Sequence, residues 1–205
     1  MHKRSVTVAL TLMLLLAPLL RGEETSSPAQ EMISQEAKDE LSLAHRFLVD
    51  GRNEDAIRGF RKALEIQPGL KQAKFGIGTA LIQSGKYREA AAIHEKLLEQ
   101  YPDDFELLNN TAWMYATSKD AAFLNPRRAI QLARQAIVIA PKQYQVWSTL
   151  SAAYYSAHQF DRALQAAEEA LRIGIANSAP QANVTRYEEQ VGQCRKAAEA
   201  FALLE

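Results

Sequence analysis

The residue types that most often carry catalysis or bind metals are few in this sequence and stand far apart. The histidines are His2, His45, His94 and His158, and the single cysteine is Cys194. A zinc site on a helix needs such ligands three or four residues apart, and no two of these residues have that spacing. One cysteine also excludes a disulfide within the chain. We therefore expect no metal and no other cofactor, and no group of residues points to an enzyme.

The balance of charge argues against a protein that binds nucleic acid. The 205 residues include 24 Lys and Arg and 24 Asp and Glu, so the formal net charge is zero. Binding to nucleic acid needs a clustered excess of positive charge, which this sequence lacks. The run Gly76-Ile77-Gly78 falls within an expected helix rather than after a strand, so it does not form a phosphate-binding loop. The remaining candidate for a functional region is therefore a surface of the protein.

Residues 1–22 have the layout of a secretory signal. Lys3 and Arg4 precede an apolar run over residues 5–20, and the segment contains no acidic residue. That run is shorter than the roughly 20 residues that span a bilayer as a helix. We therefore expect a signal peptide and an exported protein, periplasmic or secreted. The alternative is an uncleaved segment that keeps the protein close to a membrane, since Leu20 stands where a cleavage site prefers alanine.

After a polar stretch at 23–36, which we expect to be a flexible linker, the sequence repeats itself. Alanines recur at intervals of 34, 39 and 34 residues, at Ala56, Ala90, Ala129 and Ala163. Prolines recur with the same intervals of 34 and 39, at Pro68, Pro102 and Pro141. A period near 34 residues with two helix-length segments is typical of a helical repeat array. Each proline is expected to end the second helix of its pair.

The last copy of the repeat carries the clearest motif. It reads Trp147, Leu150, Ser151 and Tyr154, followed by Ala163, Ala167 and Ala170. This pattern resembles the tetratricopeptide repeat (TPR), in which W-x-x-L-G-x-x-Y is followed by alanine, a larger residue and proline. The resemblance implies an all-α fold, a right-handed superhelical solenoid of about four helix-turn-helix repeats over residues 37–176. Their approximate bounds are 37–70, 71–104, 105–143 and 144–177.

Two segments depart from the simple repeat. Five extra residues lie between Tyr115 and Ala129, and the lengthened loop carries Phe123 and Leu124. These side chains either pack onto the repeats or contact a partner. Residues 178–205 carry a narrow apolar stripe, which predicts a helix that caps the open end of the array. The alternative use of the same stripe is dimerisation.

The TPR resemblance also implies where a partner binds, because the first helices of the repeats line the concave face. The residues expected there are Leu41, His45, Phe75, Thr79, Ile82, Asn109, Trp113, Ser148, Ala152 and Tyr155. This mixture of aromatic, aliphatic and neutral polar groups suits a peptide. Trp113 and Tyr155 are the natural anchors, and Asn109 can hold a peptide backbone. The alternative is that Trp113 simply packs on a neighbouring repeat.

Some TPR co-chaperones grip an acidic tail with a clamp of Lys, Asn and Arg. The corresponding places here hold Leu41, His45, Gly76, Glu106 and Asn110, so that partner is not expected. The resemblance instead implies a non-enzymatic scaffold or adaptor that binds protein or peptide segments. We expect it to support the assembly of an envelope or secreted complex. The alternative is a permanent structural subunit of a larger membrane-associated assembly.

Overall fold

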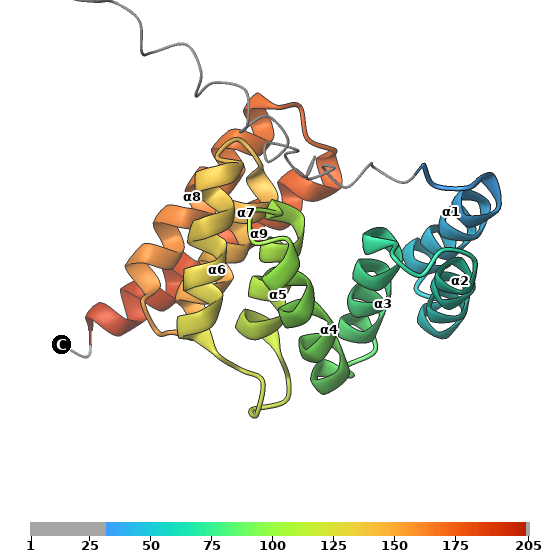
Figure 1. The fold of residues 1–205 in the computed structure, drawn as a ribbon. Coiled ribbons are helices and arrows are strands. Elements are labelled where there is room, and N and C mark those ends of the chain that lie inside the picture. The colour runs from blue at the N-terminus through green and yellow to red at the C-terminus, as the bar shows by residue number, and fades with distance from the viewer. Residues whose placement is uncertain (1–31, 204–205) are drawn as a thin grey trace, which may run out of the picture. The chain divides into compact units, whose positions relative to one another are not determined.

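The computed structural model describes residues 32–203, which contain helices, turns and loops (Figure 1). The expected signal at 1–22 and most of the expected linker lie outside the described residues. The helices are α1 (Gln35–Val49), α2 (Asn53–Ile66), α3 (Lys71–Gln83), α4 (Tyr87–Gln100), α5 (Phe105–Thr117), α6 (Pro126–Ile139), α7 (Tyr144–Ser156), α8 (Phe160–Ala176) and α9 (Gln181–Ala202). The first of them begins two residues inside the stretch that the sequence predicted to be linker.

The first eight of these helices form four antiparallel hairpins, and each hairpin packs against the next. The close pairs within hairpins are α1 with α2, α3 with α4, α5 with α6, and α7 with α8. Between hairpins, α2 contacts α3, α4 contacts α5, and α6 contacts α7. The first helices also meet, since α1 contacts α3 and α5 contacts α7. This is the stacking of a helical solenoid, as the repeat period predicted.

Local sequence sets the ends of several helices. The side chains of Ser34, Asp104 and Asn125 each accept a hydrogen bond from a backbone N–H in the first turn that follows. Gly51 and Gly85 end two hairpin turns with φ of +72° each, a conformation that glycine adopts without strain. His158 occupies the equivalent position between α7 and α8 with φ of +58°. This conformation is energetically unfavourable for a residue that has a Cβ atom.

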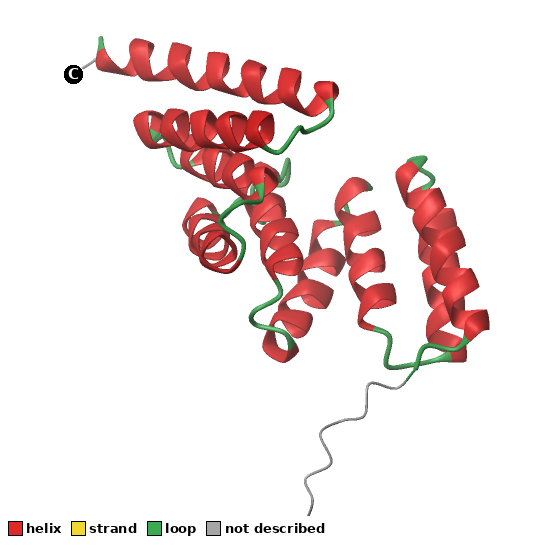
Figure 2. Ribbon diagram, turned by 90° about the horizontal axis from the view of Figure 1, so that it is seen from above, coloured by secondary structure: helices red, strands yellow, loops and turns green. Residues whose placement is uncertain are grey.

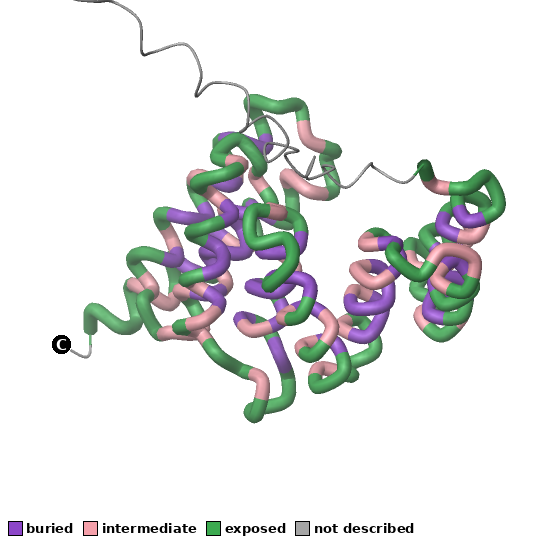
Figure 3. Tube along the Cα trace, viewed as in Figure 1, coloured by how far each residue is buried: buried purple, intermediate pink, exposed green. Residues whose placement is uncertain are grey.

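Small residues let the helices of the array approach one another closely. The recurring alanines at 56, 90, 129 and 163 are fully buried. Gly78 on α3 faces the ring of His94 on α4, and a Cβ at this glycine would overlap that ring. Figure 3 shows the buried residues concentrated where helices face each other. The repeated small residues therefore lie at the points where neighbouring helices are in closest contact.

The long loop of repeat three is ordered by its own hydrogen bonds. The backbone N–H of Asn125 donates to the Tyr115 carbonyl at 2.9 Å, and the Ser118 hydroxyl donates to the Asp120 carbonyl at 3.0 Å. Phe123 is half-buried, with the guanidinium of Arg88 on α4 5.6 Å from its ring centre. Leu124 stays 42% exposed. The loop thus packs one of its two apolar side chains and leaves the other on the surface.

The final helix covers the end of the array. α9 packs along α8, as Figure 2 shows, and buries Tyr187, Val191 and Cys194 from its apolar stripe. Its exposed positions include charged residues such as Glu188, Arg195 and Lys196. A polar outer face of this kind favours the capping role over dimerisation through the stripe. None of the helices between residues 32 and 203 combines the length and apolar character needed to cross a bilayer.

Candidate functional site

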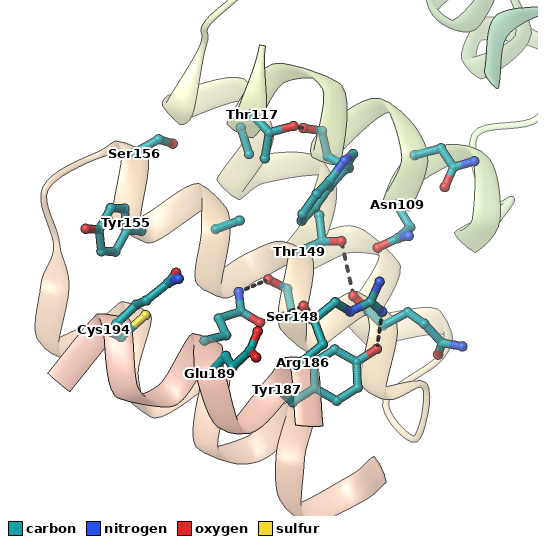
Figure 4. Close-up of a pocket in the computed structure, with 17 residues that line it drawn as sticks. Asn109, Thr117, Ser148, Thr149, Tyr155, Ser156, Arg186, Tyr187, Glu189 and Cys194 are labelled. Carbon is teal, nitrogen blue, oxygen red and sulfur yellow. Dashed lines mark hydrogen bonds between the residues drawn. The ribbon is translucent and has the colours of Figure 1, made fainter. Parts of the chain in front are cut away.

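A groove of about 480 Å³ lies between three helices, α5, α7 and α9 (Figure 4). Half of the ten residues expected on the concave face line it: Asn109, Trp113, Ser148, Ala152 and Tyr155. They come from α5 and α7, the first helices of repeats three and four. In the C-terminal half of the array, five of the residues that the repeat register placed on the concave face therefore lie around one common space. We call this space the α5–α7–α9 groove.

The third wall of this groove is α9, which the sequence predicted only as a cap. This helix contributes Arg186, Tyr187, Glu189, Gln190, Gln193 and Cys194. The sequence reasoning also missed lining residues on α5 and α7, namely Asn110, Ala116, Thr117, Gln145, Thr149 and Ser156. The sequence signal that could have revealed this third wall is the run of polar residues beside the apolar stripe of α9. That run lies on the flank of the helix that faces α7.

The expected residues from the first two repeats have other surroundings. His45 and Phe75 line a separate hollow of about 300 Å³, together with Glu106 and the paired side chains of Lys71 and Asp104. Burial by itself would raise the pKa of Asp104. The ammonium of Lys71, 2.5 Å from the Asp104 carboxylate, and the backbone N–H of Leu107 outweigh that effect, so the pKa of Asp104 is lowered. This hollow and the α5–α7–α9 groove share helix α5 as a wall.

Three expected residues line neither of these two hollows. Leu41 is only 8% exposed and belongs to the core of the first two repeats, so its assignment to the binding surface was wrong. The reason is that α1 contacts α3 as well as α2, which covers this position. Ile82 packs against the same core. Thr79 accepts a hydrogen bond of 3.4 Å from Asn110 and so links α3 to α5.

Ser148 on α7 and Gln190 on α9 form two hydrogen bonds with each other at the groove. The Ser148 hydroxyl donates to Gln190 Oε1 at 2.7 Å, and Gln190 Nε2 donates to the Ser148 carbonyl at 3.0 Å. This reciprocal pair ties α9 to α7 and fixes the width of the groove. The single hydrogen of the Ser148 hydroxyl is therefore already engaged, so this residue positions α9 and cannot also donate to a ligand without breaking that bond.

The two tryptophans of the chain differ in their surroundings. Trp147 is half-buried, and its indole N–H donates to the Pro141 carbonyl at 2.8 Å. Trp113 lines the groove with 43% of its surface exposed, and its indole N–H makes no hydrogen bond among the described residues. Tyr155 is equally exposed on α7. An aromatic side chain with an unused donor beside a hollow is the kind of group that anchors a partner.

Burial keeps two titratable side chains of the groove lining, Cys194 and Tyr187, in their neutral forms. Burial raises the pKa of the Cys194 thiol, which lies 3.5 Å from the Ser151 hydroxyl, so the sulfur stays protonated and is a poor nucleophile. Burial likewise raises the pKa of Tyr187. Arg186 and Glu189 are the charged side chains in the lining. No cluster of three metal-ligating side chains occurs in residues 32–203.

Comparison with known proteins supports the interpretation of the repeats. Residues 48–111 match the model of the tetratricopeptide repeat family. A tetratricopeptide repeat-containing protein of Caenorhabditis elegans, trd-1, is 24% identical over 152 residues, which are 74% of this chain and 19% of that protein. The chain therefore spans about a fifth of the length of this relative.

Solved structures with the same arrangement of helices come from several bacteria. A thermophilic TPR protein of Thermus thermophilus has a TM-score of 0.60 and 15% identity, covering 82% of this chain and 100% of its own. PilF of Pseudomonas aeruginosa has a TM-score of 0.60 and 18% identity, covering 78% and 76%. MamA from Desulfovibrio magneticus has a TM-score of 0.56 and 15% identity, covering 82% and 98%. Together with the four helical hairpins, these matches show that the chain has the all-α solenoid fold of tetratricopeptide repeat proteins, and residues 48–111 match the model of that repeat.

Proposed function

We propose that this protein is a non-enzymatic scaffold that binds an extended peptide segment of a partner protein in the α5–α7–α9 groove. The observation that carries the proposal is the lining of that groove. Two aromatic side chains, Trp113 and Tyr155, remain exposed there beside a group of uncharged polar residues. Isolated exposed apolar residues are common on soluble proteins, but here they share a hollow with polar groups aimed into it.

The polar groups of the lining match the chemistry of a peptide backbone. Asn109, Gln145 and Gln193 each carry an amide, which can donate and accept hydrogen bonds as a peptide unit does. Aromatic anchors would then hold the side chains of the partner, while the amides align its main chain. This combination favours a peptide over a small apolar ligand.

A side chain that fills the groove tests this proposal. Ala152 lines the groove from α7, so Ala152→Trp is expected to occupy part of the space and lower affinity for peptides by about tenfold or more. The control is Ala92→Trp, because Ala92 is an exposed alanine on α4 outside the groove lining. The measurement is binding of both variants and the wild type to an array of uncharged synthetic peptides of about ten residues. Equal binding by both folded variants would refute the assignment of the groove.

We further propose that the protein is exported and supports the assembly of an envelope or secreted complex. The support is the sequence of residues 1–22, in which a basic start precedes a short apolar run. Without these residues the chain has 21 basic and 24 acidic side chains, because Lys3, Arg4 and Arg21 are removed. The alternative is that residues 1–22 are not cleaved and keep the protein close to a membrane.

Fusing residues 1–30 to a reporter enzyme that is active only outside the cytoplasm tests this location. We expect the fusion to be active, since a signal of this layout directs export. A matched fusion in which Leu14 and Leu15 are changed to Arg should lose activity, because charge in the apolar run blocks its recognition. The same residues can also be fused to a reporter that is active only in the cytoplasm. Activity of that fusion, together with no activity of the fusion to the external reporter, would contradict export.

One observation favours the alternative of a permanent structural subunit. Val138 on α6 is 83% exposed beside Ile139, and both border a hollow of about 380 Å³ that also involves Leu98, Leu108 and Leu132. An apolar area on the side formed by second helices could be covered in a larger assembly. A permanent subunit would be unstable alone. A purified chain that melts cooperatively as a soluble monomer would therefore exclude this alternative.

A further inference from the structure

We propose that Arg186 makes the α5–α7–α9 groove select partner segments that carry a single carboxylate. The carboxylate is either the free C-terminus of the partner or one Asp or Glu side chain. This inference rests on the proposed peptide-binding function and adds a chemical class to the partner. It concerns a residue of the capping helix, outside the repeats from which the binding surface was predicted.

The exposed guanidinium of Arg186 rests against the aromatic side chain of the next residue. Its Nη2 donates to the Tyr187 hydroxyl at 3.0 Å, and its central carbon lies 5.1 Å from the centre of the Tyr187 ring. Tyr187 is fully buried and packs against Tyr144, with ring centres 5.6 Å apart. Figure 4 shows the Arg186 side chain extending from α9 toward Thr149 on α7. A rigid neighbour therefore presents the charged group to the groove and reduces the entropy lost on binding.

The positive charge of Arg186 is not neutralised within the described part of the chain. No Asp or Glu carboxylate in residues 32–203 lies within 4.0 Å of the Arg186 guanidinium. Glu189 stands one helical turn away on the same helix. By contrast, Arg172 pairs with Glu169 at 2.6 Å through the same three-residue spacing. The remaining N–H groups of Arg186 are free to donate to an added acceptor. Two parallel N–H groups of a guanidinium match the two oxygens of a carboxylate.

The charge of the groove limits the number of carboxylates that fit. Asn109, Thr149 and the other close lining groups are neutral, so the nearest negative charge in the lining is Glu189. A first carboxylate gains the attraction of Arg186. A second one placed farther along the groove meets Glu189 without a further cation. The groove is therefore suited to a peptide with one acid rather than to a run of acidic residues.

Matched peptide arrays test this selection and separate its two sources. The first array presents uncharged peptides with a free C-terminal carboxylate, the second presents the same peptides as C-terminal amides, and the third adds one internal Asp to the amides. The proteins compared are the wild type, Arg186→Gln and the control Arg195→Gln. Arg195 lies on the same helix but pairs with Glu168 and does not line the groove.

The quantity of interest is the ratio of binding to acid-containing and amidated peptides. For the wild type and Arg195→Gln we expect a preference of about tenfold for the first or the third array, as a hydrogen-bonded charge supplies. Preference for the first array identifies the C-terminus, and preference for the third identifies a side chain. Arg186→Gln should bring the ratio close to one.

Two results would overturn the inference in different ways. If amidated and acid-containing peptides bind the wild type equally, or if Arg186→Gln keeps the preference, the role of Arg186 is refuted while the groove remains a peptide site. If no array binds the wild type, the proposed function itself fails, and the inference fails with it.

Discussion

Acidification from about pH 6.5 to about pH 4 is expected to remove about 3 kcal/mol of the free energy of unfolding through His94 alone. This histidine is fully buried on α4 at the junction between repeats two and three. Burial lowers its pKa to about 4, and the backbone of Phe75 and the charge of Glu95 offset that effect only in part. A histidine in the unfolded chain keeps a pKa near 6.5.

The hydrogen bonds of His94 explain why its charged form is disfavoured. The Thr111 hydroxyl donates its single hydrogen to the Leu107 carbonyl at 2.7 Å, so its oxygen accepts from His94 Nδ1, 3.1 Å away. Nε2 therefore carries no proton, and it has no hydrogen-bond partner among the described residues. It faces Gly78, whose lack of a side chain makes room for the ring. A second proton on this ring would be poorly compensated in a buried site, because the Phe75 backbone offsets the cost of burial only in part.

The sign of the effect follows from the two pKa values. Between about pH 4 and pH 6.5 the unfolded chain binds a proton at this residue that the folded chain does not, so stability falls as the pH falls. For a domain of this size, the loss corresponds to a decrease in melting temperature of about 10 °C. Asp104, Glu54 and Glu169 also have a lowered pKa, and they add to the loss near the acid end of this range and below it, as the pH falls through their ordinary values of 3.8 and 4.5.

Urea unfolding as a function of pH measures this prediction. The control is His94→Phe, which keeps a ring at the position but has no group to titrate. The difference between the two proteins in the slope of stability against pH isolates the contribution of His94. If the wild type and His94→Phe lose stability equally between pH 6.5 and pH 4, His94 is not a buried neutral histidine.

The fold could be predicted from the sequence because its signals are local and periodic. Ala56, Ala90, Ala129 and Ala163 recur with the period of the hairpins, and each occupies the close contact between two helices. Five residues inserted in repeat three did not hide this period, since the insertion lies in a loop. Periodic small residues specify which helix faces pack, and that is sufficient to establish a solenoid.

The site could be predicted only in part, because it depends on how the last helix is rotated. The apolar stripe of residues 178–205 predicted a capping helix, and Tyr187 and Cys194 of that stripe are buried. It did not predict which polar flank of the stripe would face α7, since this depends on the pairing of Ser148 with Gln190 across the two helices. Arg186 was therefore missed. Leu41 was misassigned for a related reason, because its exposure depends on the contact of α1 with α3.

Trp113→Ala is expected to weaken peptide binding by more than an order of magnitude. The side chain offers a large, partly exposed ring and an unused indole N–H to the α5–α7–α9 groove. Loss of an aromatic anchor of this kind commonly costs about 2 kcal/mol or more of binding free energy. The effect on folding should be small, because much of the ring is already in contact with water. Trp147→Ala provides the matched control, since that indole is packed and hydrogen-bonded to Pro141.

The most direct test of the groove is the dissociation constant of one peptide, taken from the array described above, for the wild type and both tryptophan variants. Helical circular dichroism and a cooperative melt establish that each variant is folded. The groove assignment predicts that Trp113→Ala raises the dissociation constant more than tenfold with little change in melting temperature. It predicts the reverse for Trp147→Ala, with a lower melting temperature and a nearly unchanged dissociation constant. If folded Trp113→Ala binds as tightly as the wild type, the α5–α7–α9 groove is not the binding site, and the loop that carries Phe123 and Leu124 becomes the better candidate.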